Sequence, residues 1–290
     1  MNGNVVEVRG LAKRYKRFAM ENIDLEMKQG YITGLIGANG AGKSTLIKLL
    51  MGMSVPDAGE VRVFGQPVLE REAEVKERIG YVADDSHYYD HLSLADMKSI
   101  YAPFYSKWDD RTFGRYLDRF ELSPKAKIRS LSKGMKMKLS LAFALSHRAD
   151  LLIMDEPTAG LDPVFRRELL DLLADLMLDE RKSILFSTHI TTDLDRVADY
   201  IAFLDKGELV FNESKERIFD RYALVKAGRE LLDADVRALF VGIRETSSGF
   251  EALTDNRQEI ERLFADYARI ERPSLEEIMY FTAKGVGTHG

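Results

Sequence analysis

The sequence predicts an α/β fold in which a mainly parallel sheet is covered by helices on both faces. Short apolar runs at residues 31–36, 151–154 and 183–187 are typical of strands buried in the centre of such a sheet. Between the last two runs, the leucines within residues 169–176 recur at the spacing of one helix face. Because strand, helix and strand follow one another, we expect these runs to lie parallel in one sheet.

Neighbouring segments predict two additions to this core within a first domain, which we place at residues 1–212. Residues 4–9 and 22–27 alternate apolar and polar side chains, a pattern typical of half-buried antiparallel strands. We therefore expect an antiparallel β subdomain near the N-terminus. Residues 87–148 lack apolar strand runs and carry helical patterns, which predicts a helical subdomain inserted into the core.

The remaining residues, 213–290, predict a small C-terminal α+β extension. Residues 222–254 hold short strand-like runs and a Ser-Ser-Gly turn. Ser274 and Glu277 form the capping-box pattern that opens a helix. The final GVGTHG is expected to fray.

Composition limits the function. The 290 residues are 45% apolar and 31% charged, an ordinary globular balance, and their formal net charge is −5. Because nucleic-acid binders usually present a basic face, we expect no nucleic-acid partner. The lack of cysteine excludes disulfides and thiolate metal sites. No run approaches the roughly 20 apolar residues that cross a bilayer, so action at a membrane would need a separate spanning protein.

A glycine-rich loop follows the run at residues 31–36 and matches the phosphate-loop pattern G-x-x-x-x-G-K-[ST]. Its glycines let successive backbone N–H groups point at one phosphate, and the next helix adds its dipole. Lys43 can reach the β- and γ-phosphates, and the Ser44 hydroxyl can ligate Mg²⁺. The order of strand, loop and helix disfavours the alternative, a glycine turn that binds nothing. The residues expected to bind ATP here are Gly37, Asn39, Gly40, Ala41, Gly42, Lys43, Ser44 and Thr45.

Two carboxylates, Asp155 and Glu156, follow the apolar run at 151–154. Asp155 can hold Mg²⁺ through its water shell, because hard oxygen ligands suit that ion. Glu156 can orient or deprotonate an attacking water. The alternative is a solvated acidic turn, which the preceding phosphate loop and buried strand disfavour.

Together with these motifs, residues 4–212 resemble the ABC ATPase family. The segment LSKGM at residues 131–135 is similar to the family signature, which is usually LSGGQ. The resemblance implies that Ser132 and Gly134 bind the γ-phosphate of ATP held by the opposite subunit. Asp162, in TAGLDP, resembles the aspartate of the loop that crosses the dimer interface.

Three other positions are similar to functional residues of the family. His189, in FSTH, matches the histidine that contacts the γ-phosphate, so the implied catalytic group is Glu156, His189 and Lys43. Tyr15 has the spacing of the aromatic residue that stacks on adenine; the alternative is a surface aromatic. Asp84 occupies the place of a glutamine and is expected near Mg²⁺.

The sequence departs from the family pattern at three positions. Lys133 replaces a glycine and Met135 replaces a glutamine of the signature, which affects a polar contact to the ribose. Asp84 brings a carboxylate where an amide is usual, and so adds a negative charge near the metal.

The resemblance implies an ATPase subunit that binds ATP and Mg²⁺, pairs head-to-tail with a second ATPase subunit, and drives a separate integral membrane permease. The pair could be a homodimer or a heterodimer. The place implied is cytoplasmic, peripheral at the inner face of the cell membrane. The single-domain layout and the tail ending PSLEEIMYFTAKG are most similar to bacterial antibiotic-exporter ATPases. The alternatives are a soluble ABC ATPase of translation or repair, disfavoured by the lack of a second ATPase domain or coiled-coil insertion, and a non-enzymatic nucleotide binder.

Other side chains leave two interpretations open. The aromatic residues between 88 and 108 could form a permease-binding surface, or the core of the helical subdomain, and we expect a mixture. His87 and His91 lie near acidic residues and could hold a metal, although such clusters in polar loops are usually just solvated. A basic run from Lys125 to Lys138 is either a solvated face or an attraction for phosphate groups.

Overall fold

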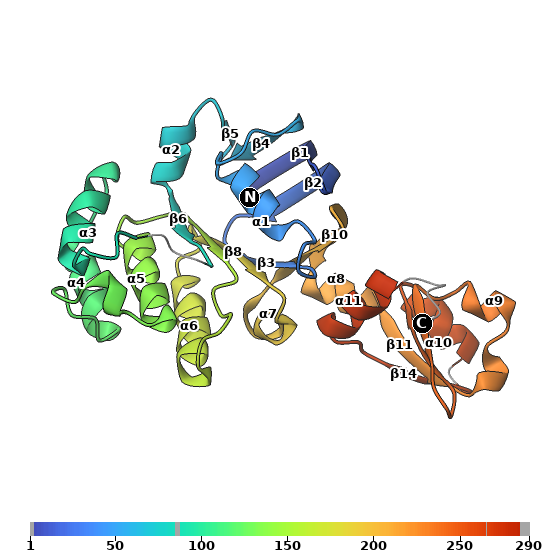
Figure 1. Cartoon of the computed structure of the whole chain (residues 1–290). Helices are drawn as coiled ribbons and strands as arrows, with labels where there is room; N and C mark the ends of the chain where they lie inside the picture. The colour runs from blue at the N-terminus through green and yellow to red at the C-terminus, as the bar shows by residue number, and fades with distance from the viewer. Residues whose placement is uncertain (1–2, 85–87, 265, 285–290) are drawn as a thin grey trace. The chain divides into compact units, whose positions relative to one another are not determined.

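The computed structural model describes residues 3–84, 88–264 and 266–284. The contacts divide the chain into two compact units, Met1–Asn212 and Glu213–Gly290, which are described separately. Figure 1 labels their helices and strands. Residues 85–87 and the terminal GVGTHG lie outside the described residues, so the expectations for His87 and for the end of the chain concern a part that the structure does not describe.

A six-stranded sheet forms the centre of the first unit, with strand order β10-β9-β3-β8-β7-β6. Its strands are β3 (Ile32–Ile36), β6 (Ile79–Val82), β7 (Leu151–Asp155), β8 (Ser183–Thr188), β9 (Tyr200–Asp205) and β10 (Glu208–Ser214). The first five pair in parallel. Every residue of β3, β7 and β8 is buried, which confirms the interpretation of the three apolar runs as central strands.

Helices cover both faces of this sheet (Figure 1). Helix α1 (Lys43–Leu50) packs on one face, where Leu46 shares a core with Leu35 of β3. Helices α6 (Pro163–Leu176) and α7 (Thr191–Val197) lie on the other face. Helix α7 comes so close that a Cβ atom on Gly34 of β3 would lie 2.6 Å from Leu194 Cδ1. The glycine therefore permits this packing.

The predicted N-terminal antiparallel subdomain is a four-stranded sheet of order β2-β1-β4-β5. It contains β1 (Asn4–Tyr15), β2 (Phe18–Lys28), β4 (Ala58–Val63) and β5 (Gln66–Pro67). The first two strands extend well beyond the predicted segments. The register between them shifts between Val8 and Leu11 and again before Lys13, which breaks the alternation by which the sequence revealed them.

Three helices form the predicted helical subdomain: α3 (Leu94–Tyr101), α4 (Asp110–Arg119) and α5 (Lys133–Leu145). They follow β6 and the short α2 (Glu72–Glu77) and return the chain to β7. Phe143 of α5 lies at the aromatic centre, with ring centroids 4.5 Å from Tyr101 and 5.2 Å from Phe113. Phe104 and Tyr89, by contrast, are 78% and 58% exposed. The aromatic residues are therefore the expected mixture of core and surface.

The second unit is α+β, as predicted. Its antiparallel sheet has the order β12-β13-β11-β14. The elements in chain order are α8 (Lys215–Arg221), β11 (Ala223–Ala227), α9 (Ala234–Arg237), β12 (Gly242–Glu245), β13 (Phe250–Thr254), α10 (Arg257–Phe264), β14 (Arg269–Glu271) and α11 (Leu275–Lys284). The capping box is confirmed: the Glu277 N–H donates to Ser274 Oγ at 3.2 Å, and Glu277 Oε2 accepts from the Ser274 N–H at 2.7 Å.

Among the described helices, none combines the length and the apolar character that crossing a bilayer requires.

Candidate functional site

Four parallel strands end at one edge of the six-stranded sheet, and predicted site residues follow each of them. Ile36, the last residue of β3, pairs with Thr188 of β8, and Asp155 of β7 pairs with Ser187. The strand ends are therefore aligned, and this edge is where open α/β sheets bind ligands. The segments that follow the strands carry the glycine loop, His189, Glu156 and Asp84.

The glycine loop owes its shape to two positions where no other residue fits. A Cβ atom on Gly37 would lie 2.3 Å from the Leu204 carbonyl oxygen. Gly42, the N-cap of α1, has a φ of 115°, and a Cβ atom there would lie 2.8 Å from Phe18 Cζ. These close approaches fold the loop over the first turn of α1, so that backbone N–H groups and the positive helix end face the same space.

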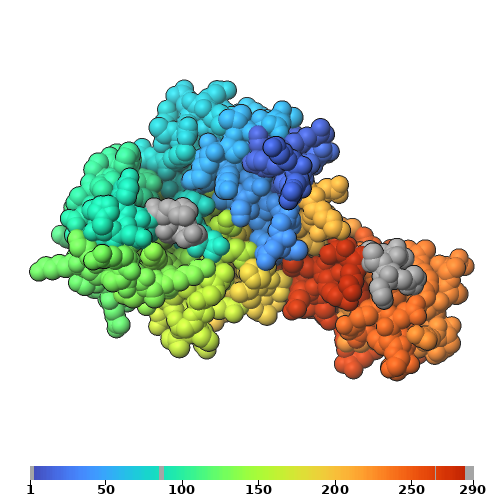
Figure 2. Space-filling model, in the orientation of Figure 1, coloured from blue at the N-terminus to red at the C-terminus, as the bar shows by residue number. Residues whose placement is uncertain are grey.

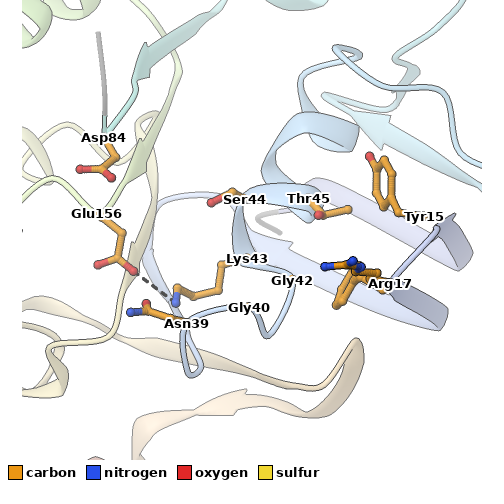
Figure 3. A pocket seen from close by; sticks show the side chains of 11 residues that line it. Tyr15, Arg17, Asn39, Gly40, Gly42, Lys43, Ser44, Thr45, Asp84 and Glu156 are labelled. Atoms are coloured by element: carbon orange, nitrogen blue, oxygen red, sulfur yellow. Dashed lines mark ion pairs between the residues drawn. The ribbon is translucent and has the colours of Figure 1, made fainter.

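Lys43 lies buried beneath the loop, with its side chain 6% exposed. Its ammonium group donates to the Gly37 carbonyl oxygen at 2.7 Å and to the Ala38 carbonyl oxygen at 3.4 Å. It also pairs with Glu156 Oε1 at 3.2 Å (Figure 3). One buried cation thus joins the loop after β3 to the carboxylate after β7.

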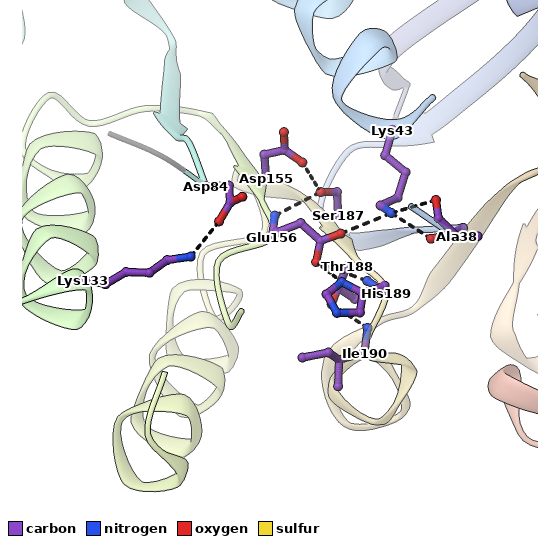
Figure 4. Close-up of polar contacts among 11 residues, drawn as sticks. Ala38, Lys43, Asp84, Lys133, Asp155, Glu156, Ser187, Thr188, His189 and Ile190 are labelled. Atoms are coloured by element: carbon purple, nitrogen blue, oxygen red, sulfur yellow. Dashed lines mark hydrogen bonds and ion pairs between the residues drawn. The ribbon is translucent and has the colours of Figure 1, made fainter. Parts of the chain in front are cut away.

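Glu156 is held in an uncommon backbone conformation, with a φ of 49°. Its N–H donates to the carbonyl oxygen and to Oγ of Ser187, both at 3.1 Å. Glu156 Oε2 lies 2.7 Å from His189 Nδ1, and Ser187 Oγ donates to Asp155 Oδ1 at 2.6 Å (Figure 4). These contacts from β8 fix both carboxylates, and strained conformations held in this way are concentrated at functional sites.

A cavity of about 550 Å³ opens beside these residues (Figure 3). Nine of the predicted site residues lie together in its lining. The lining residues are Tyr15, Arg17, Phe18, Asn39, Gly40, Gly42, Lys43, Ser44, Thr45, Asp84 and Glu156. Seven other predicted residues lie outside the lining. Four of them adjoin it: Gly37 contacts Lys43, His189 contacts Glu156, Asp155 contacts Ser187, and Ala41 lies within the loop itself.

Tyr15 at the end of β1 forms a wall of the cavity contributed by the N-terminal sheet. It is 48% exposed, and Lys13 Nζ lies 5.7 Å from the centroid of its ring. Arg17 and Phe18 line the cavity beside it and were not among the predicted site residues. A basic and an aromatic residue so soon after Tyr15 could have indicated them. Ser187 was not among the predicted site residues either. Nothing in the sequence around it indicates that it contacts Asp155 and Glu156, which precede it by 32 and 31 positions.

Asp84 lines the far end of the cavity from Tyr15 and pairs with Lys133 of α5, with Oδ1 and Nζ 3.0 Å apart (Figures 3 and 4). Burial, together with the charges of Asp155 and Asp84, raises the pKa of Tyr81 to about 12. The cavity lining thus includes two carboxylates, Asp84 and Glu156. The Tyr81 phenol, on which Asp84 and Asp155 act, stays protonated at neutral pH.

A magnesium ion fits the donor set at this end of the site. Asp84 and the Ser44 hydroxyl line the cavity with hard oxygen atoms, and Asp155 adjoins it through Ser187, which also contacts Glu156. Mg²⁺ commonly takes one or two carboxylates and keeps several waters. By contrast, the part of the chain that the structure describes contains no group of three or more His, Asp or Glu residues able to hold a metal by themselves. The histidine–carboxylate interpretation around His91 gains no support from the described residues.

Ser132, Gly134 and Asp162 do not line the cavity. Ser132 is the exposed N-cap of α5 and accepts from the Met135 N–H at 3.2 Å. Asp162 is the N-cap of α6 and accepts from the N–H groups of Val164 and Phe165, each at 3.0 Å. Ser132 and Gly134 therefore lie at the beginning of α5, and Asp162 at the beginning of α6, outside the lining of the cavity.

The sequence around this site is similar to that of known proteins. Residues 20–159, which include the loop and both carboxylates, match the family model described as ABC transporter. The bacitracin transport ATP-binding protein BcrA of Bacillus licheniformis is 30% identical over 73% of this chain and 72% of its own length. The Nod factor export ATP-binding protein I of Cupriavidus pinatubonensis is 33% identical over 74% of this chain and 68% of its own.

The chain belongs to the family of ABC transporter ATP-binding proteins. A solved structure of an ATP-binding subunit of an ABC transporter agrees, with a TM-score of 0.66 and 27% identity over 74% of this chain and 92% of that one. The predicted fold class is thus confirmed. As an ABC transporter ATP-binding protein, the chain is expected to hydrolyse ATP.

Proposed function

We propose that this ABC ATP-binding protein hydrolyses ATP at the edge of its central sheet and uses the reaction to drive export through a separate membrane permease. The observation that carries the proposal is the convergence of Lys43, Glu156, His189 and Asp84 from four aligned strand ends beside one cavity. The names of BcrA and of the Nod factor protein, which refer to transport and export, support the direction.

The cavity suits ATP from end to end. Tyr15 offers an aromatic face for adenine, the glycine loop offers backbone N–H groups to the phosphates, and Lys43 offers a buried ammonium group. Mg²⁺, held through Ser44, Asp155 and Asp84, would supply positive charge that offsets the charge on the phosphates. The cavity thus has the half-exposed ring of Tyr15 at one end and the charged groups of Lys43, Glu156 and Asp84 at the other.

Glu156 is the proposed general base. Its carboxylate is only 13% exposed, and Lys43 and His189 hold its two oxygen atoms from opposite sides. A carboxylate fixed in this way can orient a water and take its proton. His189, which is 45% exposed, is the proposed contact to the γ-phosphate and also positions Glu156.

A second subunit is proposed to complete each site. Ser132, which is exposed, and Gly134 lie at the beginning of α5, where the helix dipole favours an anion. Because these residues do not line their own cavity, we propose that they face the γ-phosphate of ATP bound to a second copy. One chain carries both halves, so two copies would form two complete sites.

The permease is proposed to bind the helical subdomain. Phe104, Tyr89 and Ile100 are 78%, 58% and 42% exposed, and large aromatic residues are enriched where protein surfaces meet. The test is a pull-down of the tagged chain from detergent-solubilised membranes of its source cells. An integral membrane protein should co-purify with the wild type and be lost with Phe104→Glu, while Leu178→Glu, at an 84% exposed position just after α6 and outside the helical subdomain, should retain it. Recovery of ribosomes or of repair proteins would favour the soluble ABC ATPase instead.

A further inference from the structure

Two of the three departures from the family pattern contact each other. Lys133 stands at the first position of α5 and Asp84 follows β6, 49 positions earlier, yet their charged groups lie 3.0 Å apart (Figure 4). The Lys133 side chain also runs past Gly160, where a Cβ atom would lie 3.9 Å from Lys133 Cδ. A side chain flanked by Asp84 and by the loop before Asp162 has a defined direction, toward the cavity.

Lys133 differs from its basic neighbours in its ion-pair partner, which lines the cavity. Lys136 pairs with Asp90 at 3.5 Å and Lys127 with Asp96 at 3.9 Å, and neither acidic partner lines the cavity. Lys133 alone in this described basic run contacts a cavity-lining carboxylate. The space-filling view shows that the helical subdomain borders the rest of the first unit (Figure 2).

The charges around the cavity explain why this contact matters. Its lining carries two carboxylates, Asp84 and Glu156, and a polyphosphate would add several negative charges. Lys43 already pairs with Glu156. Among the described residues, Lys133 is the cation that pairs with Asp84, so without it the charge of Asp84 would face the polyphosphate unpaired, and like charges in a partly enclosed site repel.

We propose that Lys133 is a positioning residue of the nucleotide site in its own subunit: it neutralises Asp84 and holds that carboxylate where it can face Mg²⁺ without repelling the γ-phosphate. This inference rests on the proposed function, because it requires ATP in the cavity. The proposal explains two departures from the family pattern together: the lysine at position 133 compensates the charge that the aspartate at position 84 introduces.

The expected effect is modest. Both side chains are about half exposed, at 54% and 49%, and pairs of this kind contribute about 0.2–1 kcal/mol. This corresponds to about a 1.4- to fivefold change in an equilibrium constant. The repulsion is greatest when no metal offsets the phosphate charge, so binding without Mg²⁺ is the sensitive measurement.

The test is a set of binding curves for a fluorescent ATP analogue, with EDTA and with saturating Mg²⁺. With EDTA, Lys133→Ala should weaken binding about 1.4- to fivefold, with a smaller loss in Mg²⁺. Lys133→Arg should restore the wild-type value. Added to Asp84→Asn, Lys133→Ala should have no further effect, because no charge remains to be neutralised.

Lys136→Ala is the matched control, because it removes one positive charge from the same helix but leaves the Asp84 pair intact. If Lys133→Ala binds like Lys136→Ala, the inference is wrong. If Lys133→Ala weakens binding equally in the Asp84→Asn background, Lys133 acts on the nucleotide directly and not through Asp84, which also overturns it. Failure of the wild type to bind ATP, or wild-type binding by Lys43→Ala, would instead refute the nucleotide site itself.

Discussion

We expect Glu156→Gln to separate ATP binding from hydrolysis in this protein. Glutamine keeps the shape of the side chain and an oxygen that can face Lys43, which lies 3.2 Å from Oε1. Its amide cannot take a proton from water. Loss of a general base typically slows a reaction about 10²–10⁴-fold, which corresponds to about 2.7–5.5 kcal/mol of transition-state stabilisation. ATP affinity should be kept, because a negative charge near the polyphosphate is removed while Lys43 still donates to the Gly37 and Ala38 carbonyl oxygens.

Phosphate release from Mg-ATP gives the turnover, and binding of a fluorescent ATP analogue shows that the variant still takes up nucleotide. Glu168→Gln is the control, since Glu168 is an exposed acidic residue of α6 that does not line the site. It should hydrolyse ATP at the wild-type rate. Wild-type turnover by Glu156→Gln would refute its role as the base.

Further predictions follow from single side chains. Lys43→Ala should lose most ATP affinity, because a buried phosphate loses its main cation; equal titration curves for variant and wild type would contradict the loop assignment. Asp84→Asn should make ATP binding less dependent on Mg²⁺, whereas Asp84→Gln should leave a working ATPase; superimposable Mg²⁺ titrations for wild type and Asp84→Asn would remove Asp84 from the metal site. His147 is fully buried, and burial lowers its pKa. The unfolded chain therefore binds a proton at this histidine more readily than the folded chain does. The free energy of unfolding should fall as pH drops below about 6.5, the usual pKa of a histidine in an unfolded chain. His147→Gln, compared by thermal melts at pH 7.5 and 5.5, should lose part of that fall, and an unchanged pH dependence would count against it.

Much of the fold follows from local patterns in the sequence. The runs that became β3, β7 and β8 are apolar throughout, because both faces of a central parallel strand are buried. Strands β4 and β9 were not predicted as such. Residues 58–63 are half exposed and carry charges, and residues 200–205 become a strand through pairing with β3, a partner far away in sequence.

For the site, too, the sequence predicted the local motifs but not the contacts between distant residues. Motifs that act within one loop, such as the turn that presents Lys43, are local, so the sequence reveals them. Contacts such as Ser187 to Asp155, or Lys133 to Asp84, join residues brought together only when the strands align in one sheet and α5 packs beside β6. No local pattern records such pairs, which is why the three departures looked independent in the sequence.

The proposal that a second copy completes each ATP site can be tested by the mass of Glu156→Gln in solution, measured by light scattering with Mg-ATP and with Mg-ADP. The control adds Ser132→Asp, which keeps a good N-cap for α5 but places a carboxylate where the γ-phosphate is expected. The account predicts that the mass doubles with ATP, stays that of one chain with ADP, and fails to double when Ser132→Asp is added although ATP still binds. A single-chain mass at saturating ATP, or doubling that persists with Ser132→Asp, would contradict it.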